Sequence, residues 1–314
     1  MICFMIFFCV ILILILRNHS ESYIDCAEYF FGYACQKYKR LLRETEDIKE
    51  MIEVKDLKKE YKIARKSDGI AGQLKHLIMP RYDTLEAVKG ISFRISEGEC
   101  VAFLGANGAG KSTTIKMLTG IMRPSEGVVR IMGKDPFSNR IDNARKIGVV
   151  FGQKTQLWWD IPVIESFNLL KHIYSLSDRQ YSQNMEKFSS ILGLHDFLTQ
   201  PARKLSLGQR VRADLAASLL HEPPILFLDE PTIGVDVTAK QKIYEFLREI
   251  NREKKTTILL TSHDMKDLES LCRRLIILEK GKILFDDSIE HLFDKYDEGT
   301  SLEQIIIELF ENGN

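Results

Sequence analysis

The chain has 314 residues, of which 45% are hydrophobic and 28% charged, which is enough apolar material for one large or two small packed domains. This hydrophobic fraction argues against a disordered chain, and the 19 glycines and 8 prolines are too few for a fibrous one. Lysine plus arginine total 44, as do aspartate plus glutamate, so the basic excess typical of nucleic-acid-binding proteins is lacking and no nucleic-acid partner is expected.

The first 50 residues differ in composition from the rest of the chain. Residues 1–16 are all apolar, and this run is slightly shorter than the ~17–25 residues of a membrane-spanning helix. It also lacks the charged start and the cleavage site of a secretory signal. Two interpretations stay open for residues 1–50: an upstream start without function, or a membrane anchor. In the second case the cations that follow, beginning with Arg17, would leave the rest of the chain in the cytoplasm.

The cysteines give no sign of a local site. They lie at positions 3, 9, 26, 35, 100 and 272, and no two of them have a CxxC spacing. This pattern predicts neither a disulfide framework nor a zinc site nor a redox pair. It indicates a reducing compartment.

From Met51 onward the sequence predicts a single α/β unit. Short apolar runs alternate with amphipathic segments, which is typical of buried parallel strands joined by helices. Residues 66–81 interrupt this pattern and predict an inserted loop or short helix, 279–286 a small hairpin, and 301–310 a terminal helix. The expected strands begin with a run at Met51 and continue at 99–104, 147–151, 225–228, 257–260 and 275–278.

A glycine-rich motif follows the strand that ends at Leu104 and precedes a helical stretch at 114–118. This is the GxxxxGK[ST] phosphate-binding loop in its proper strand–loop–helix context. Its glycines let successive backbone N–H groups point at phosphates, and the helix N-terminus adds a favourable dipole. Lys111 is expected to reach the β- and γ-phosphates, and the Ser112 hydroxyl to coordinate Mg²⁺. The predicted nucleotide-binding residues are Gly105, Ala106, Asn107, Gly108, Ala109, Gly110, Lys111, Ser112 and Thr113.

Two polar features come next along the chain. Gln153 follows the strand at 147–151, where its amide can approach the metal and the attacking water. The motif Leu205-Ser-Leu-Gly-Gln209 precedes a helix at 211–220, of which Ser206 is the predicted N-cap. With Gly208, Ser206 presents another helix start able to bind an anion, although by itself this is also an ordinary cap.

Carboxylates end the apolar strand at 225–228. Asp229 is expected to hold Mg²⁺ through water, and Glu230 to polarise or orient the attacking water, because parallel strands end beside the phosphate loop. His263 follows the strand at 257–260 and can hydrogen-bond the γ-phosphate there. A purely structural histidine is the alternative.

Together these motifs resemble those of the ATP-binding subunit of ABC transporters over residues 51–314. The resemblance implies a P-loop NTPase fold with a mainly parallel sheet core, a small antiparallel β subdomain and a helical subdomain at about 154–205. The ATP-binding domain would cover 51–286 and a helical tail 287–314. The motifs, in the family's order, are Walker A (105–113), the Q-loop (Gln153), the signature (205–209), Walker B (225–230), the D-loop (Asp236) and the H-loop (His263).

The resemblance also implies a head-to-tail dimer, with itself or with a related ATPase, that encloses two ATP molecules. Each site joins the Walker motifs of one subunit to the signature and D-loop of the other. The implied trans contacts are Ser206, Gly208, Gln209 and Asp236, the metal ligands Ser112, Gln153 and Asp229, and the catalytic residues Glu230, His263 and Gln153.

In this family an aromatic residue after the first strand stacks on adenine. Tyr61 fits that place, although the insertion at 66–81 lengthens the chain between it and the phosphate loop. Tyr82, which follows the insertion, is the alternative.

Several details resemble one bacterial subgroup of the ABC-2-type exporter branch. Leu207 occupies the position at which many members of the family have a glycine in the signature motif, and the D-loop reads Ile233-Gly-Val-Asp236. This branch implies ATP-driven export through a separate transmembrane subunit, with the ATPase held at the cytoplasmic face of the membrane. Trp158 and Trp159 lie where helices of the membrane subunit dock in the family, and packing inside the helical subdomain is the alternative.

The competing function is that of an ABC ATPase not tied to transport. A single Walker A motif disfavours a role in translation, and DNA-maintenance members need long coiled-coil insertions that this sequence lacks. Only the exporter-like signature argues against a role in iron–sulfur assembly. A role in import is disfavoured by the family resemblance alone.

Overall fold

The computed structural model describes residues 49–64, 82–152, 154–262, 264–296 and 299–312. The chain divides into two units, Met1–Lys49 and Glu50–Asn314, and all the predicted nucleotide-binding motifs belong to the second. The apolar run at 1–16 and the insertion at 66–81 lie outside the described residues. Whether the first is a membrane anchor or a start without function, and whether the second is a loop or a short helix, therefore stay predictions. Within the described ranges, no helix combines the length and the apolar character needed to cross a bilayer.

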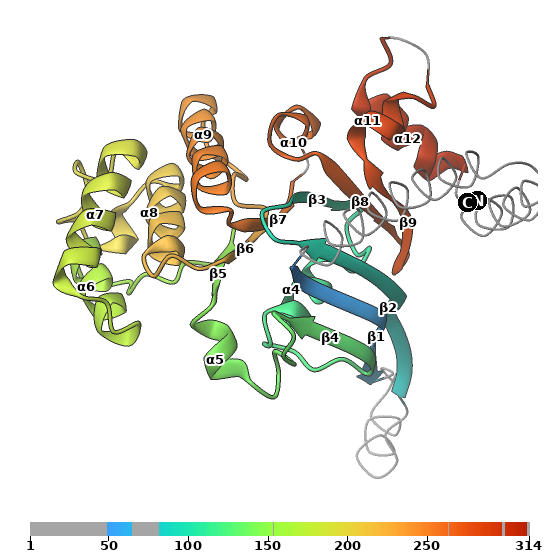
Figure 1. Cartoon of the computed structure of the whole chain (residues 1–314), viewed down its shortest axis with the longest axis horizontal. Coiled ribbons are helices and arrows are strands. Elements are labelled where there is room, and N and C mark those ends of the chain that lie inside the picture. Colours follow the sequence, from blue (N-terminus) through green and yellow to red (C-terminus); the bar gives the residue numbers. More distant parts are fainter. Residues whose placement is uncertain (1–48, 65–81, 153, 263, 297–298, 313–314) are drawn as a thin grey trace, which may run out of the picture. The chain divides into compact units, whose positions relative to one another are not determined.

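A six-stranded sheet in the order β5-β6-β7-β3-β8-β9 forms the centre of the second unit (Figure 1). The pairs from β5 to β8 are parallel, and β9 is antiparallel to β8. Alternate residues enter two apolar clusters, one on each face: Ala102 and Leu104 face one, Val101 and Phe103 the other. Burial on both faces explains the near-continuous apolar runs and confirms the predicted strands. Their bounds are β3 Cys100–Gly105, β5 Ile147–Phe151, β6 Ile225–Asp229, β7 Thr257–Thr261, β8 Arg274–Glu279 and β9 Lys282–Ser288.

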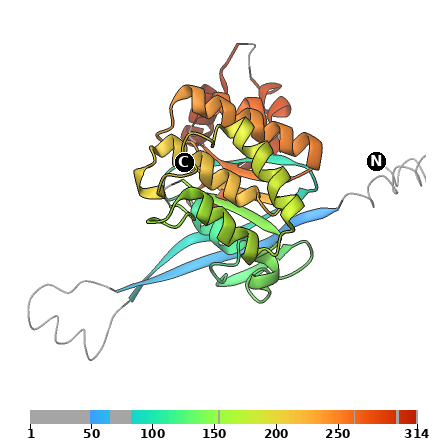
Figure 2. The ribbon, with the colours of Figure 1, turned by 90° about the vertical axis from the view of Figure 1, so that its left-hand side faces the viewer.

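A three-stranded antiparallel sheet covers one face of the central sheet. Its order is β2-β1-β4, with β1 Glu50–Ala64, β2 Tyr82–Ser96 and β4 Glu126–Ile131. Buried residues such as Ile52 share a cluster with Phe103 of the central sheet and with Ile115 of α4, Lys111–Leu118. Beyond this cluster β1 and β2 continue as a long two-stranded ribbon (Figure 2). The predicted β subdomain is therefore confirmed.

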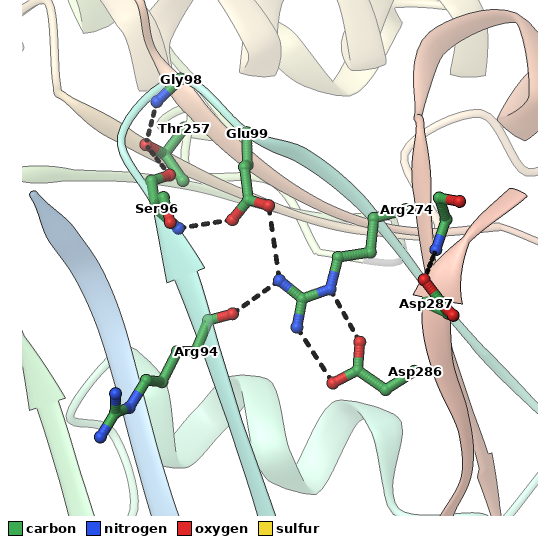
Figure 3. A network of polar contacts seen from close by, with 9 residues as sticks. Arg94, Ser96, Gly98, Glu99, Thr257, Arg274, Asp286 and Asp287 are labelled. Carbon is green, nitrogen blue, oxygen red and sulfur yellow. Dashed lines mark hydrogen bonds and ion pairs between the residues drawn. The ribbon is translucent and has the colours of Figure 1, made fainter. Parts of the chain in front are cut away.

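A polar network joins the two sheets where the strands of the parallel sheet begin (Figure 3). Arg274 of β8 makes two bonds to Asp286 of β9, at 2.7 and 3.0 Å, and donates to the Arg94 carbonyl of β2 at 2.8 Å. Glu99 accepts from Arg274 at 3.4 Å and from the Ser96 backbone N–H at 2.5 Å. These bonds fix the sheets to each other at the end opposite to the phosphate loop.

Helices cover the other face and extend beyond it (Figure 1). The predicted helical subdomain contains α6 and α7, which contact α8, and the side chain of Ser177 caps α7. The predicted terminal helix is confirmed as α12, whose Leu302 and Ile305 are buried. The helices are α5 Arg140–Ala144, α6 Val163–Ile173, α7 Asp178–Leu192, the 3-10 turn Ala202–Lys204, α8 Leu207–Leu219, α9 Val237–Lys254, α10 Met265–Leu271, α11 Ile289–Phe293 and α12 Leu302–Asn312.

Two cysteines far apart in the sequence meet in the fold. The Sγ atoms of Cys100 and Cys272 lie 3.3 Å apart, and both residues are free thiols. Cys100 begins β3 and Cys272 ends α10 just before β8, and these two strands are neighbours. The cysteine spacing, which gave no indication of a pair, missed this one because spacing reports only local neighbours and the sheet makes this contact.

Candidate active site

The phosphate loop runs from the end of β3 to the start of α4, as predicted. Two glycines in it have no room for a side chain: a Cβ on Gly105 would lie 2.4 Å from the Leu278 carbonyl oxygen, and one on Gly110 2.6 Å from that of Ala87. Gly110 also has a φ of +107°, which favours glycine. It is the N-cap of α4 and provides no capping side chain. The first N–H groups of α4 therefore point into the loop without a side-chain acceptor at the cap.

Lys111 lies inside the curl of this loop. Its Nζ donates to the carbonyl oxygens of Gly105 at 2.6 Å and Ala106 at 3.2 Å, and its side chain is 6% exposed. Burial lowers the pKa of Lys111, and the carboxylates of Glu230 and Asp229 oppose this shift. The cation is thus held where phosphates would pass, beside both Walker B carboxylates. Ser112 follows it on the exposed side of the first turn of α4.

Of the two tyrosines proposed to contact adenine, Tyr61 is the one beside the phosphate loop. Its hydroxyl lies 3.4 Å from Thr113 Oγ1 and donates to Met122 Sδ at 3.1 Å. Tyr82 pairs with Ala64, further out along the β1–β2 ribbon, and is 54% exposed. The length added by the insertion is therefore accommodated beyond Tyr61.

The two Walker B residues Asp229 and Glu230 are both bonded by Thr261, which the sequence did not single out. Thr261 ends β7 and pairs with Asp229 in the sheet, and its hydroxyl donates to Asp229 Oδ1 at 2.9 Å. The Glu230 backbone N–H donates to Thr261 O at 3.2 Å and to Oγ1 at 2.9 Å. Glu230 has a φ of +54°, a left-handed conformation that costs roughly 1–2 kcal/mol for a residue with a side chain. Thr261 thus holds Glu230 in a strained backbone conformation.

Gln153 and His263 lie outside the described residues, so the positions of their side chains stay predictions. Their neighbours do contact the Walker B segment. The Gly152 N–H donates to the Asp229 carbonyl at 2.8 Å, and a Cβ on Gly152 would lie only 2.1 Å from the Glu230 carbonyl oxygen. Ser262 and Asp264 flank His263 and line a cleft of about 540 Å³ that also contains Glu230. Gly152 was not identified from the sequence as a site residue. The signal that could have identified it is its position directly before Gln153.

The signature segment begins α8 as expected. Ser206 is the N-cap: its Oγ accepts the Gln209 N–H at 3.2 Å, and Gln209 Oε1 accepts the Ser206 N–H at 2.9 Å, which is a capping box. Gly208 faces the D-loop of the same chain, because a Cβ there would lie 3.5 Å from Asp236 Oδ2. Asp236 in turn caps α9 by accepting the Ala239 N–H at 2.9 Å. The signature and the D-loop of this chain thus lie side by side.

Two buried titratable groups at α8 shift in opposite directions. Burial raises the pKa of Asp214 to about 6, although hydrogen bonds from Gln156 and Thr155 and the charge of Arg210 oppose the shift. Burial lowers the pKa of His221 to about 4, and its Nε2 donates to the Ile147 carbonyl at 3.1 Å. Folding therefore favours neutral Asp214 and neutral His221.

The Asp214→Asn variant is expected to be more stable than wild type at pH 7, by roughly 1–3 kcal/mol, and equally stable below about pH 4. Asp214 binds a proton more tightly in the folded than in the unfolded chain, so its contribution falls as the pH rises from 3.8 to about 6. His221 acts oppositely between about 4 and 6.5, so the variant should lose stability in acid more steeply than wild type. Urea unfolding at several pH values measures both effects, and a pH-independent gain would contradict the assignment.

Comparisons with known proteins agree with this geometry. Residues 88–233 match the sequence model of the family described as "ABC transporter". The chain is 32% identical to the ABC transporter ATP-binding protein NatA of Bacillus subtilis, over 67% of this chain and 85% of that protein. It is 37% identical to the Nod factor export ATP-binding protein I of Burkholderia pseudomallei, over 64% of this chain and 66% of that one.

A solved structure extends the likeness to the fold and the reaction. It is a dimeric, post-hydrolysis state of the ATP-binding cassette MJ0796 bound to ADP and Pi. The TM-score is 0.63 at 26% identity, over 76% of this chain and 99% of that one. The chain therefore belongs to the ABC transporter family, as an ATP-binding subunit that hydrolyses ATP.

Proposed function

We propose that this chain energises export by a separate transmembrane subunit, and that it does so as one half of an ATPase dimer at the cytoplasmic face of the membrane. The observation that carries the ATPase part is the convergence of the phosphate loop, Lys111 and the Walker B carboxylates at one edge of the parallel sheet. The exporter part is supported by the likeness to a protein named for Nod factor export.

Within the site, each residue has a role that fits its chemistry. The loop residues 105–113 and Lys111 bind the phosphates, and Tyr61 stacks on adenine. Oxygen donors are the ligands that Mg²⁺ prefers, and Ser112, Asp229 and the amide of Gln153 supply them. Glu230 orients the attacking water and His263 contacts the γ-phosphate. Thr261 supports these assignments, since it orients Asp229 and Glu230 together.

The dimer is proposed to complete each site with the signature of the other subunit. Ser206 and Gly208 begin α8 on the exposed side of the molecule, and Gln209 and Asp236 lie with them. Apolar side chains border this surface: Ile233 is 44% exposed and Val237 81%. Such residues suit a subunit contact. Both a homodimer and a heterodimer with a related ATPase fit this arrangement.

The membrane subunit is proposed to contact the tryptophan pair. Trp158 and Trp159 lie between β5 and α6 and are 41% and 49% exposed, so the helical subdomain does not enclose them. Leu169 and Ile173 of α6 add exposed apolar side chains nearby in the sequence. Aromatic anchors of this kind often carry much of the binding energy of an interface.

Replacing both tryptophans, Trp158→Ala with Trp159→Ala, is expected to weaken membrane recruitment by about 30-fold or more, the effect of losing a binding hot spot of ~2 kcal/mol. Flotation of cell membranes measures the bound fraction. Ile141→Ala, on α5, is the control, since Ile141 is an apolar residue that is 71% exposed. Unchanged recruitment of the double variant would show that this surface does not bind the membrane subunit.

The decisive experiment for the proposed function identifies the partner. Glu230→Gln protein, which should retain ATP, is purified with ATP and Mg²⁺ from mildly solubilised cells. Stoichiometric recovery of a polytopic membrane protein is expected. If ribosomes, DNA or a cysteine desulfurase were recovered instead, the assignment as an ATPase would stand and the proposed role in transport would be refuted.

A further inference from the structure

Asp214 connects the segment after Gln153 to the middle of α8. Its side chain is buried, with 5% exposed, and Oδ1 accepts the Thr155 hydroxyl at 2.8 Å and the Gln156 N–H at 3.0 Å. The Gln156 side chain returns a bond from Nε2 to the Asp214 carbonyl at 2.7 Å. Thr155 Oγ1 also accepts the Leu157 N–H at 3.1 Å. Asp214 of α8 thus bonds two consecutive residues of this segment directly, and Leu157 is joined to them through Thr155.

The same segment is held at its other end by the Walker B strand. Gly152 donates to the Asp229 carbonyl at 2.8 Å, and Lys154 donates to the Phe151 carbonyl at 2.9 Å. The described residues on either side of Gln153 are therefore bonded, Gly152 to the Walker B strand and Thr155 and Gln156 to Asp214.

Beyond Leu157, α8 continues to contact the chain. Arg210, one turn before Asp214, places its guanidinium 5.8 Å from the ring centre of Trp159. The Trp158 N–H donates to Ser166 Oγ of α6 at 3.1 Å. The helix that begins at Ser206 is thus connected through Asp214 and Arg210 to the whole stretch from Thr155 to Trp159.

Asp214 is not a residue that folding alone favours. Burial raises its pKa, so the ionised form at neutral pH costs the folded chain stability. What Asp214 supplies through geometry is one acceptor oxygen, Oδ1, bonded to both Thr155 and Gln156.

We propose that Asp214 is a positioning residue for ATP hydrolysis: it couples the signature helix α8 to the segment that follows Gln153, so that the two move as one. The proposal rests on the proposed function, in which α8 contacts the ATP of the other subunit and Gln153 the metal. When α8 responds to that ATP, Asp214 carries the displacement to Gln153 on one side and to the tryptophan pair on the other.

The first test follows the segment itself. Trp158 and Trp159 are the two tryptophans of the chain, so intrinsic fluorescence reports on this segment. Acrylamide quenching of the full chain is expected to rise about twofold in Asp214→Ala, as local opening increases. It should stay at the wild-type level in Asp214→Asn, which keeps an acceptor oxygen. Asn184→Ala is the matched control: Asn184 is equally buried at 5% and bonds the Leu220 carbonyl at 3.0 Å, at the far end of α8.

The second test measures turnover. Asp214→Ala is expected to lower kcat by about 10–100-fold with little change in the KM for ATP, because misplacement of a reacting geometry slows the reaction more than it weakens binding. Asp214→Asn should keep most of the wild-type kcat, and Asn184→Ala should lower the melting temperature without lowering kcat. Thr155→Val should reduce kcat in the same direction, and its effect should not add to that of Asp214→Ala.

The outcomes separate this proposal from the proposed function. If wild-type protein hydrolyses ATP while Asp214→Ala matches it in kcat, the positioning role is overturned, even where quenching has risen. If Asp214→Ala shows wild-type quenching, the coupling itself is overturned. Wild-type protein without ATPase activity would refute the proposed function, and quenching would still decide whether Asp214 holds the segment.

Discussion

Glu230→Gln is expected to lower the kcat for ATP hydrolysis by about 10²–10³-fold, the usual effect of removing a group that acts on the transition state. The amide has the size of the carboxylate, and the bonds from the Glu230 backbone N–H to Thr261 do not involve the side chain that is changed. The strained φ of +54° should therefore be kept while the charge that polarises water is lost. ATP binding should persist, so an ATP-bound dimer should accumulate. Phosphate release and size-exclusion chromatography with ATP measure the two effects.

The cleft beside Glu230 offers a matched control for this variant. Glu303 of α12 lines the same cleft, of about 540 Å³, and Glu303→Gln makes the same chemical change without touching the Walker B strand. Its turnover should stay within about twofold of wild type, as for a substitution away from the reacting groups. Wild-type turnover in Glu230→Gln would refute the role given to Glu230, whereas equal losses in both variants would assign the effect to the charge of the cleft.

The parts of the fold that the sequence predicted are those determined by local pattern. Apolar runs gave the strands of the central sheet because both faces are buried, and the serine before an alanine- and leucine-rich stretch gave the N-cap of α8. The phosphate loop was predictable because glycine positions report backbone geometry directly. At Gly105 and Gly110 the neighbouring carbonyls leave no space for a side chain.

What the sequence did not predict depends on contacts between distant segments. Thr261 lies 32 residues after Asp229, and only the parallel register of β6 and β7 brings its hydroxyl to the carboxylate. Asp214 lies 59 residues after Thr155 and reads in the sequence as an ordinary polar residue of a helix. Cys100 and Cys272 are further apart still. No periodicity marks such pairs, since each depends on the order in which strands and helices pack.

The tryptophan pair is an intermediate case. The sequence left two places open for Trp158 and Trp159, a contact with the membrane subunit or the inside of the helical subdomain, and both residues lie in the segment that connects β5 to α6. Both are about half exposed. Their aromatic character was readable from the sequence, and their exposure was not.

Lys111→Ala is expected to weaken ATP binding by about 100-fold, since a charge-assisted contact with phosphate contributes ~2–3 kcal/mol. Without nucleotide the variant should be about as stable as wild type. The reason is that burial lowers the pKa of Lys111, so that burying the charged side chain costs stability, and this cost offsets its two bonds to the loop carbonyls. Bound phosphates would supply the compensating negative charge. The stabilisation of wild type by ATP, seen as a rise in melting temperature, should therefore be absent in the variant.

Lys116→Ala provides the control for this measurement. Lys116 lies on the last turn of the same helix α4, where a cation interacts favourably with the helix dipole. Its loss should lower the melting temperature slightly and leave the rise on adding ATP and Mg²⁺ unchanged. If Lys111→Ala showed that same rise, the lysine would be a structural part of the loop, and the phosphates would be held by the backbone N–H groups of residues 105–113 alone.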